Sequence, residues 1–224
     1  YMFGYCQALT SLDVTNFNTG NVTDMGGMFN GCYNLSSLDV TNFNTVKVTN
    51  MNYMFWKCYK LSSLDVTKFN TEKVTNMRGM FSDCKALTSL DLTYFNTENV
   101  TKMEYMFSDC LELTAIFASN KFVTHQVSTS NDMFSNCKKL KGDKEWTEDN
   151  ATDKTYATIN GGYFTRNNAY PCVKYADGTL TFYYKNNKTL GENEYELNSD
   201  EKAPEWLTYK DNITNVVFDT SFAK

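Results

Sequence analysis

The sequence predicts an α/β repeat solenoid with a parallel sheet on one side and short helices on the other, followed by a small C-terminal β-hairpin region. Three observations lead to this prediction. Cysteines recur at a fixed spacing, apolar residues beside each cysteine follow a helical period, and a segment after each cysteine follows the period of a strand. The spacing is 26 residues four times and then 27, at Cys6, Cys32, Cys58, Cys84, Cys110 and Cys137.

The segment that leads into each cysteine is predicted to be a short helix. Its apolar residues stand at positions i, i+3, i+4 and i+7, which share one helical face; in the second repeat they are Met25, Met28, Phe29 and Cys32. Thr23 precedes this segment, and Thr49 precedes its next copy. Each threonine is expected to cap the free backbone N–H groups at the start of a helix.

The segment that follows each cysteine is predicted to be a short strand. Residues 37–41 alternate polar and apolar side chains with period two, and Phe43 and Asn44 then form an irregular return. A unit of this size cannot bury its own Met, Phe, Leu and Val side chains, so each repeat must cover its neighbour. About five stacked turns of a right-handed solenoid are expected, with parallel strands ~4.8 Å apart.

Three regions are expected along the chain. The repeats occupy residues 1–141, and a polar segment that begins near Gly142 marks a linker over residues 142–168. Residues 169–224 form a β-hairpin region around Asp177-Gly178, a pair typical of tight hairpin turns. The region ends in a degenerate repeat rung, because residues 213–222 repeat the apolar offsets of residues 113–122.

Composition excludes several classes of protein. Hydrophobic residues make up 42% of the 224 residues, as in a globular chain. The net charge of −5 opposes nucleic-acid binding, which depends on Lys and Arg, so no nucleic-acid partner is expected. The chain contains no run of 18 apolar residues, so no transmembrane segment is expected in it. The chain begins inside a repeat, at Tyr1-Met2-Phe3, and is expected to be part of a longer protein.

One motif supports a family resemblance. The repeat reads Met-Phe-x-x-Cys-x-x-Leu-x-x-Leu-Asp-Val/Leu-Thr-x-Phe-Asn-Thr-x-x-Val-Thr-x-Met over residues 1 to about 141. It resembles the leucine-rich-repeat frame and, more closely, the 26-residue repeat of BspA-like bacterial surface proteins. The resemblance implies an extracellular or cell-surface location within a longer anchored protein. It also implies a role in adhesion or protein binding, since some members bind host matrix proteins.

The sequence gives no sign of catalysis, and no catalytic, cofactor-binding or metal-binding residue is assigned. The cysteines lack the close pairs that zinc sites use, and His125 is the only histidine available as a base. A ladder of buried, reduced thiols is expected at Cys32, Cys58 and Cys84, although adjacent repeats could also bring cysteines within bonding distance. No enzyme activity and no cofactor are therefore expected.

Two surfaces are candidates for ligand binding. An outward column of carboxylates recurs in the strands, where like charges would repel unless they have partners, which are loop N–H groups, a lysine or a cation. Local backbone bonding is favoured for this column, which comprises Asp13, Asp39, Asp65 and Asp91. The second candidate is an aromatic patch, expected either to bind a partner or to cover the helix ends. It comprises Tyr33, Tyr53, Trp56 and Tyr59.

A non-catalytic cell-surface binding module is the function expected, acting as a monomer through a lateral repeat surface. Its ligand would be a protein or a glycan on another cell or matrix. The alternatives are a carbohydrate-binding module and a passive structural spacer. Variation at one frame position, occupied by Asn42, Lys68 and Tyr94, favours binding over a spacer.

Overall fold

The computed structural model describes residues 1–152, 154–166, 170–185, 194–196 and 205–218. The chain divides into two compact units, Tyr1–Arg166 and Asn167–Lys224.

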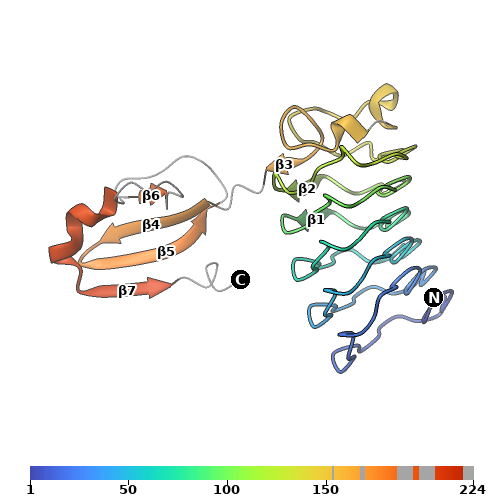
Figure 1. Ribbon diagram of the computed structural model, residues 1–224, viewed down its shortest axis with the longest axis horizontal. Helices are drawn as coiled ribbons and strands as arrows, with labels where there is room; N and C mark the ends of the chain where they lie inside the picture. Colours follow the sequence, from blue (N-terminus) through green and yellow to red (C-terminus); the bar gives the residue numbers. More distant parts are fainter. Residues whose placement is uncertain (153, 167–169, 186–193, 197–204, 219–224) are drawn as a thin grey trace. The chain divides into compact units, whose positions relative to one another are not determined.

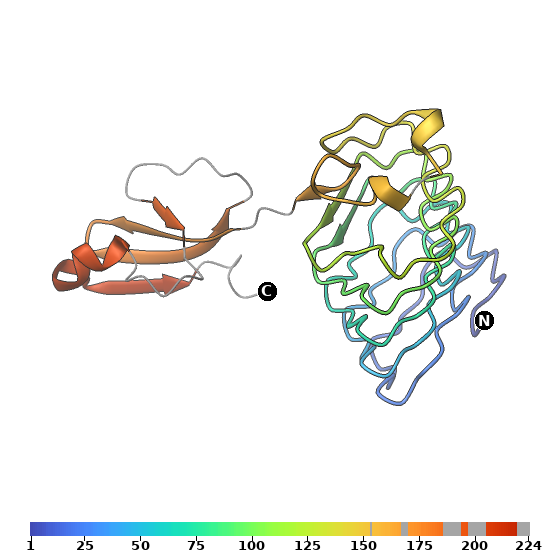
Figure 2. The ribbon, with the colours of Figure 1, turned by 45° about the horizontal axis from the view of Figure 1, so that its top comes forward.

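The first unit is a stack of coils, with one 26-residue repeat per coil (Figure 1). We number the complete coils by their residues: coil 2 is 25–50, coil 3 is 51–76, coil 4 is 77–102 and coil 5 is 103–129. A column of parallel bridges joins successive coils at Asp24, Asn50, Asn76, Lys102 and Thr129. Figure 2 shows the coils lying over one another around a common interior.

The interior is a set of columns in which each coil contributes the same residue type. The phenylalanine column is stacked from coil to coil, with ring centroids 5.5–5.9 Å apart. It consists of Phe3, Phe29, Phe55, Phe81, Phe107 and Phe134. The frame's Met, Cys, Leu and Val side chains line the same core, and most of them are fully buried. The core positions that the repeat predicts are therefore confirmed.

The sheet of this unit is small. It contains β1 (Ser89–Leu92), β2 (Ala115–Ala118) and β3 (Thr165–Arg166), all parallel and in the order β1-β2-β3. Leu90 pairs with Ile116, and both side chains are buried. In coils 2 and 3 the corresponding segments run alongside without forming regular strands.

The prediction of an α/β solenoid with short helices is wrong. The described residues contain no α-helix, and the segments that lead into the cysteines are runs of turns. Within a coil, backbone N–H groups bond three residues back, as from Met28 to Met25 and from Cys32 to Phe29, both at 3.2 Å. Every second N–H instead reaches the next coil: Gly27 donates to the carbonyl of Asn52 (2.8 Å).

A turn run and a helix give the same apolar spacing, which explains the error. In both, residues three and four apart face the same side, so the sequence period does not separate them. The two differ in the sign of the backbone φ angle at alternate positions. Gly27 and Gly31 have φ values of 60° and 73°, and Tyr53 and Lys57 repeat this conformation at 54° and 61°. Left-handed residues turn alternate N–H groups toward the neighbouring coil, which prevents i to i−4 bonding.

The threonines expected to cap helices bond between coils instead. The hydroxyl of Thr49 donates to the carbonyl of Thr23, and the hydroxyl of Thr75 donates to that of Thr49, at 3.2 and 3.3 Å. The residue that follows each threonine caps the start of the turn run with its side chain. The Oδ1 atom of Asp24 accepts the N–H of Gly26 at 2.7 Å. Asn50 and Asn76 do the same in the following coils.

Residues 142–166, expected as part of a linker, lie in the first unit. They include two short 3₁₀ helices, η1 (Glu148–Asn150) and η2 (Lys154–Tyr156), followed by β3. Tyr163 and Phe164 are fully buried and meet the ring of Phe134 edge-on, with centroids 5.1 and 6.0 Å away. This segment therefore closes the phenylalanine column.

The second unit is a four-stranded sheet in the order β6-β4-β5-β7. Its elements are β4 (Tyr170–Ala176), β5 (Thr179–Lys185), β6 (Glu194–Glu196), the 3₁₀ helix η3 (Glu205–Asn212) and β7 (Asn215–Phe218). Strands β4 and β5 form the hairpin, with φ values of 48° at Asp177 and 75° at Gly178 that suit a type I′ turn. Strand β7, from the segment expected as a rung, pairs in parallel with β5. Residues 219–222 of that segment lie outside the described residues.

Candidate functional site

The cysteine column is structural. The thiols of Cys32, Cys58 and Cys84 are fully buried, as expected, and the structure contains them as free cysteines. Each thiol lies 3.2–3.3 Å from a phenylalanine carbonyl of the preceding coil, to which it donates. A thiol held in this way links two coils and is not positioned for attack on a substrate.

Burial also suppresses the reactive form of these thiols. Desolvation raises the pKa of Cys32 to about 11 and that of Cys84 to about 12. The same cause raises the pKa of Cys58 further and that of Cys137 to about 12. Because the thiolate is the nucleophile, these cysteines are inert at neutral pH while the coils are folded.

The carboxylate column is engaged by local hydrogen bonds. In Asp13, Asp39, Asp65 and Asp91 the Oδ1 atom accepts both the backbone N–H and the hydroxyl of the threonine two residues later. For Asp39 these distances to Thr41 are 2.9 and 2.6 Å. The aspartate thus stabilises the turn that ends each strand segment, which accounts for its recurrence without a ligand.

These bonds favour the charged form of the carboxyl group. The threonine hydroxyl, and after it the threonine N–H, lowers the pKa of Asp13 and of Asp39. Asp13 and Asp39 therefore remain ionised at neutral pH. In the described residues, no three His, Cys, Asp or Glu side chains gather into a group that could hold a metal ion.

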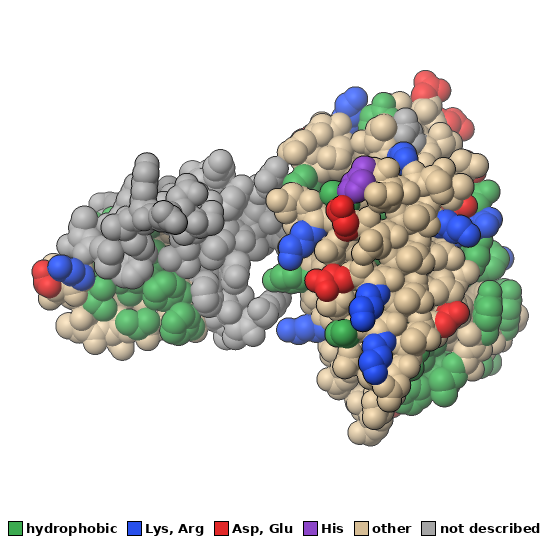
Figure 3. All heavy atoms as spheres, in the orientation of Figure 1, with side chains coloured by type: hydrophobic (Ala, Val, Ile, Leu, Met, Phe, Trp, Pro, Cys, Tyr) green, Lys and Arg blue, Asp and Glu red, His purple; other side chains and the backbone are tan. Residues whose placement is uncertain are grey.

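The aromatic patch is present as two ring pairs. Tyr33 and Tyr59 stack with centroids 4.9 Å apart, and Tyr53 and Trp56 lie 5.0 Å apart at a tilt of 43°. All four side chains are partly buried. Figure 3 shows hydrophobic side chains gathered along one margin of the coils.

Asp83 joins the two pairs. Its Oδ2 atom accepts the indole N–H of Trp56 at 3.3 Å, and its Oδ1 atom lies 3.5 Å from the ammonium group of Lys85. That ammonium group also lies 4.5 Å from the ring centre of Tyr59. The patch is therefore one connected cluster across coils 2, 3 and 4.

Arg78 extends the cluster into coil 5. Its guanidinium carbon lies 5.7 Å from the ring centre of Tyr53 and 5.6 Å from that of Tyr105. The Nε atom of Arg78 and the Oε2 atom of Glu104 are buried polar atoms without a hydrogen-bond partner in the described structure. We call the whole set the turn surface: Tyr33, Tyr53, Trp56, Lys57, Tyr59, Arg78, Asp83, Lys85, Glu104 and Tyr105.

A Tyr–Gly alternation builds this surface. At one left-handed backbone position the coils carry Gly27, Tyr53, Gly79 and Tyr105 in turn. A Cβ atom on Gly79 would lie 2.4 Å from Cε1 of Tyr53, because that ring lies across the glycine. The Tyr53 ring thus needs a glycine at position 79 of the next coil, whereas Asp132 follows Tyr105 at the same backbone position. Sequence analysis missed the alternation even though its 26-residue spacing was visible.

The two candidate surfaces thus differ in what they offer. The aspartates are brought into one column but are satisfied locally, whereas the aromatic residues are brought together with Arg78 and Lys85. Sequence analysis missed those two cations and Asp83, since no pattern within a single repeat marks them. In the described part of the chain, no helix has the length and apolar character needed to cross a bilayer.

Comparison with known proteins gives one match, in two overlapping parts. A family model described as "Mycoplasma protein of unknown function, DUF285" matches residues 1–64 and 61–168. No curated protein and no solved structure matches the chain. A model that matches twice in succession agrees with the tandem coils of the first unit. The matches span the whole coil stack and its closing segment, and the chain belongs to this DUF285 family of repeat proteins.

Proposed function

We propose that the chain is a non-catalytic binding module that binds a protein partner through the turn surface. One observation carries the proposal: Arg78 is held between Tyr53 and Tyr105 at the centre of an aromatic cluster that crosses four coils. Arginine, tyrosine and tryptophan dominate the binding energy of protein interfaces. Side chains already held by ring and cation contacts lose little conformational entropy on binding.

Two polar atoms without hydrogen-bond partners also support the turn surface as the binding site. Buried donors and acceptors are nearly always paired, so the Nε atom of Arg78 and the Oε2 atom of Glu104 call for partners. Both atoms are buried in the free chain, so a polar group of a bound protein would reach them only if the two side chains turn outward on binding.

A sugar ligand suits this surface less well. Sugar rings pack on open aromatic faces, but Tyr59 has Tyr33 against it and Lys85 over it. The ring of Tyr53 contacts Trp56 and lies across Gly79. The turn surface therefore offers ring edges, cations and polar atoms, which match a protein better than a glycan.

Location and adhesion form the finer part of the proposal. The resemblance to BspA-like surface proteins supports a place outside the cell, in a longer anchored protein. An adhesive role follows if the partner belongs to another cell or to the matrix. A passive spacer remains the alternative that the experiment must separate.

The experiment is a binding screen with two matched triple variants. The chain is applied to an array of purified matrix proteins and glycans, and each hit is measured again with Y33S/W56S/Y59S and with D39N/D65N/D91N. The aromatic variant is expected to weaken binding to a protein at least tenfold, while the aspartate variant retains it. The proposal is overturned if the aspartate variant loses binding while the aromatic variant retains it. It is also overturned if the parent chain binds no protein on the array. Circular dichroism establishes that both variants keep the parent fold.

A further inference from the structure

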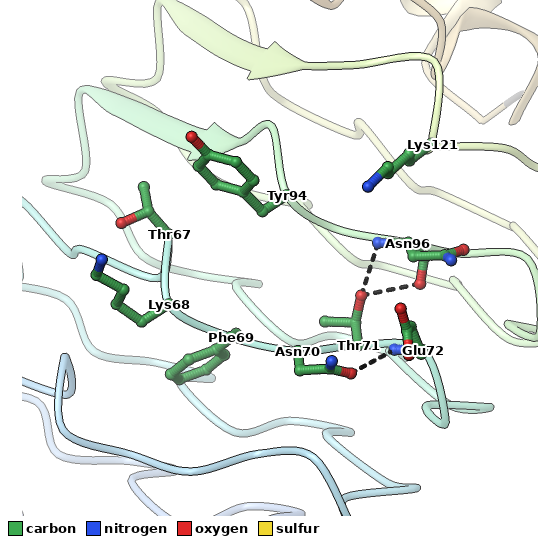
Figure 4. A pocket seen from close by; sticks show the side chains of 9 residues that line it. All are labelled: Thr67, Lys68, Phe69, Asn70, Thr71, Glu72, Tyr94, Asn96 and Lys121. Carbon is green, nitrogen blue, oxygen red and sulfur yellow. Dashed lines mark hydrogen bonds between the residues drawn. The ribbon is translucent and has the colours of Figure 1, made fainter. Parts of the chain in front are cut away.

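A hollow of about 310 Å³ lies in another part of the coils, where the chain leaves the strand segments. It spans coils 3, 4 and 5 and is separate from the turn surface. Figure 4 shows the side chains around it. They are Thr67, Lys68, Phe69, Asn70, Thr71, Glu72, Tyr94, Asn96 and Lys121.

The hollow is bordered by the one-residue insertion of coil 5. In the regular coils the Thr71 hydroxyl donates to the carbonyl of Asn96, 25 residues later. The equivalent hydroxyl of Thr97 donates to Val123, 26 residues later. The hydroxyl of Ser119 still keeps a 26-residue offset to Thr93, which is the normal strand register. The extra residue therefore lies between Ser119 and Val123, in the loop that carries Lys121 to the rim.

The walls of the hollow mainly offer hydrogen-bond donors. The amide oxygen of Asn70 accepts the N–H of Glu72, and that of Asn96 accepts the N–H of Glu98, both at 3.1 Å. These bonds fix both amides with the oxygen toward the backbone, so the NH₂ groups are the donors left for a ligand. Lys68 and Lys121 add two exposed ammonium groups, against one lining carboxylate, Glu72.

An aromatic ring lies between the two cations. Tyr94 is 51% exposed, and Figure 4 shows its ring between Lys68 and Lys121. The two lysines belong to coils 3 and 5, on either side of the coil that carries Tyr94. Their flexible four-carbon stems allow both ammonium groups to reach one anion placed beside the ring.

We propose that this hollow binds an acidic saccharide, with a sugar ring against Tyr94 and its carboxylate between Lys68 and Lys121. A volume near 310 Å³ is at the lower end for small-molecule sites and suits one or two sugar rings. The amides of Asn70 and Asn96 donate to ring hydroxyls or to the carboxylate. The proposal goes beyond the protein-binding function and does not depend on it.

Isothermal titration calorimetry with three matched probes tests the site. Trigalacturonic acid carries the rings and the charge, whereas its methyl ester keeps the rings without the charge. A triglutamate peptide keeps the charge without the rings. The acid is expected to bind, and the ester and the peptide are expected to bind at least tenfold more weakly. Equal binding by the ester or the peptide, or no binding by the acid, overturns the proposal.

Variants locate the binding on the structure. K68Q, K121Q and Y94A are each expected to weaken binding of the acid about twofold to fivefold, a range typical of single exposed charge or ring contacts. K73Q is the matched control, because Lys73 is an exposed lysine of coil 3 that does not line the hollow. Equal losses in K73Q and K68Q would show attraction to general surface charge and overturn the site.

Discussion

The interior of the coils and the turn surface use one backbone frame in different ways. In the interior every coil presents the same side chain: Phe55, Phe81 and Phe107 are all fully buried, and their stacked rings are nearly parallel. At the turn surface one backbone position alternates between tyrosine and glycine, as at Tyr53 and Gly79. An interior position is restricted by identical neighbours on both sides. A surface position is restricted by its backbone conformation and by the single ring that crosses it.

The largest expected effect on stability comes from truncating a ring of the phenylalanine column in the interior. Phe81→Ala removes a ring stacked on both sides, at 5.8 and 5.9 Å, and should lower the free energy of unfolding by about 3–5 kcal/mol. Urea denaturation measures it. Tyr94→Ala, at a ring that is 51% exposed, is the control and should change stability little. A loss below about 1 kcal/mol for Phe81→Ala would contradict the column's role.

The second prediction concerns the Tyr–Gly alternation. Gly79→Ala places a Cβ atom 2.4 Å from the Tyr53 ring at a φ of +58°, and should cost about 2–3 kcal/mol in all. About 1–2 kcal/mol of this is the left-handed conformation itself. Chemical denaturation of the single and double variants separates the two contributions.

Two controls accompany that measurement. Gly161→Ala has a similar φ of +73° and no atom within 4 Å of the added Cβ, so it should show the conformational cost alone. Tyr53→Ala combined with Gly79→Ala should remove the steric part. Strict additivity of the two single variants would mean that the ring does not restrict the glycine.

The third prediction is a pH dependence of the cysteine column. Desolvation raises the pKa of Cys84 from 9.0 to about 12, so the unfolded chain loses this proton first as pH rises. The native state then binds more protons, and stability falls between these two values by about 1.4 kcal/mol per pH unit for this thiol. Below pH 9 its contribution is complete.

The slope of stability against pH measures the thiol. From pH 8 to 10.5, Cys84→Ala should show a shallower decline than the parent, whatever its stability at neutral pH. Val100→Ala, which truncates another fully buried side chain of coil 4, should lose stability but keep the parent slope. Identical slopes for the parent and Cys84→Ala would show that this thiol ionises alike in both states.

The smallest effect is expected at the carboxylate column. The bonds from Thr41 lower the pKa of Asp39, so its contribution is present above the unfolded value near 3.8 and is lost as pH falls through the folded value. Asp39→Asn keeps an acceptor oxygen and should destabilise less than Asp39→Ala. Thermal unfolding at pH 7 and pH 3 tests both variants. If the stability difference between the parent and Asp39→Ala were larger at pH 3 than at pH 7, the assignment would be contradicted.

The repeat frame made the interior predictable from the sequence, because each position had several copies to compare. Val40, Leu35 and Cys32 were expected inside and are fully buried. The helices were wrong because the apolar period cannot report the sign of φ, and left-handed residues such as Lys57 are not glycines. The outward aspartates were identified, but the sequence alone left loop N–H groups, a lysine and a cation open as their partners.

The surfaces were harder to predict, since they depend on contacts between different positions of neighbouring coils. Trp56 was selected as an aromatic, yet its bond to Asp83 joins residues 27 apart. The sandwich of Arg78 combines two rings from the coils on either side. Aligning the repeats compares residues at the same repeat position, so it does not reveal contacts between different positions of neighbouring coils.

The left-handed position just before each cysteine has a consequence for how such proteins diversify. Tyr5, Gly31, Lys57, Asp83, Asp109 and Asn136 all hold this conformation, with φ between 59° and 73°. Hydrogen bonds to the adjacent coil impose it, as when the N–H of Lys57 donates to the carbonyl of Ser82. Glycine is therefore not obligatory there, and aromatic, acidic, basic and amide side chains all occupy the same site. Mutation can thus rewrite the chemistry of this edge one coil at a time, while the shape that presents it is inherited unchanged.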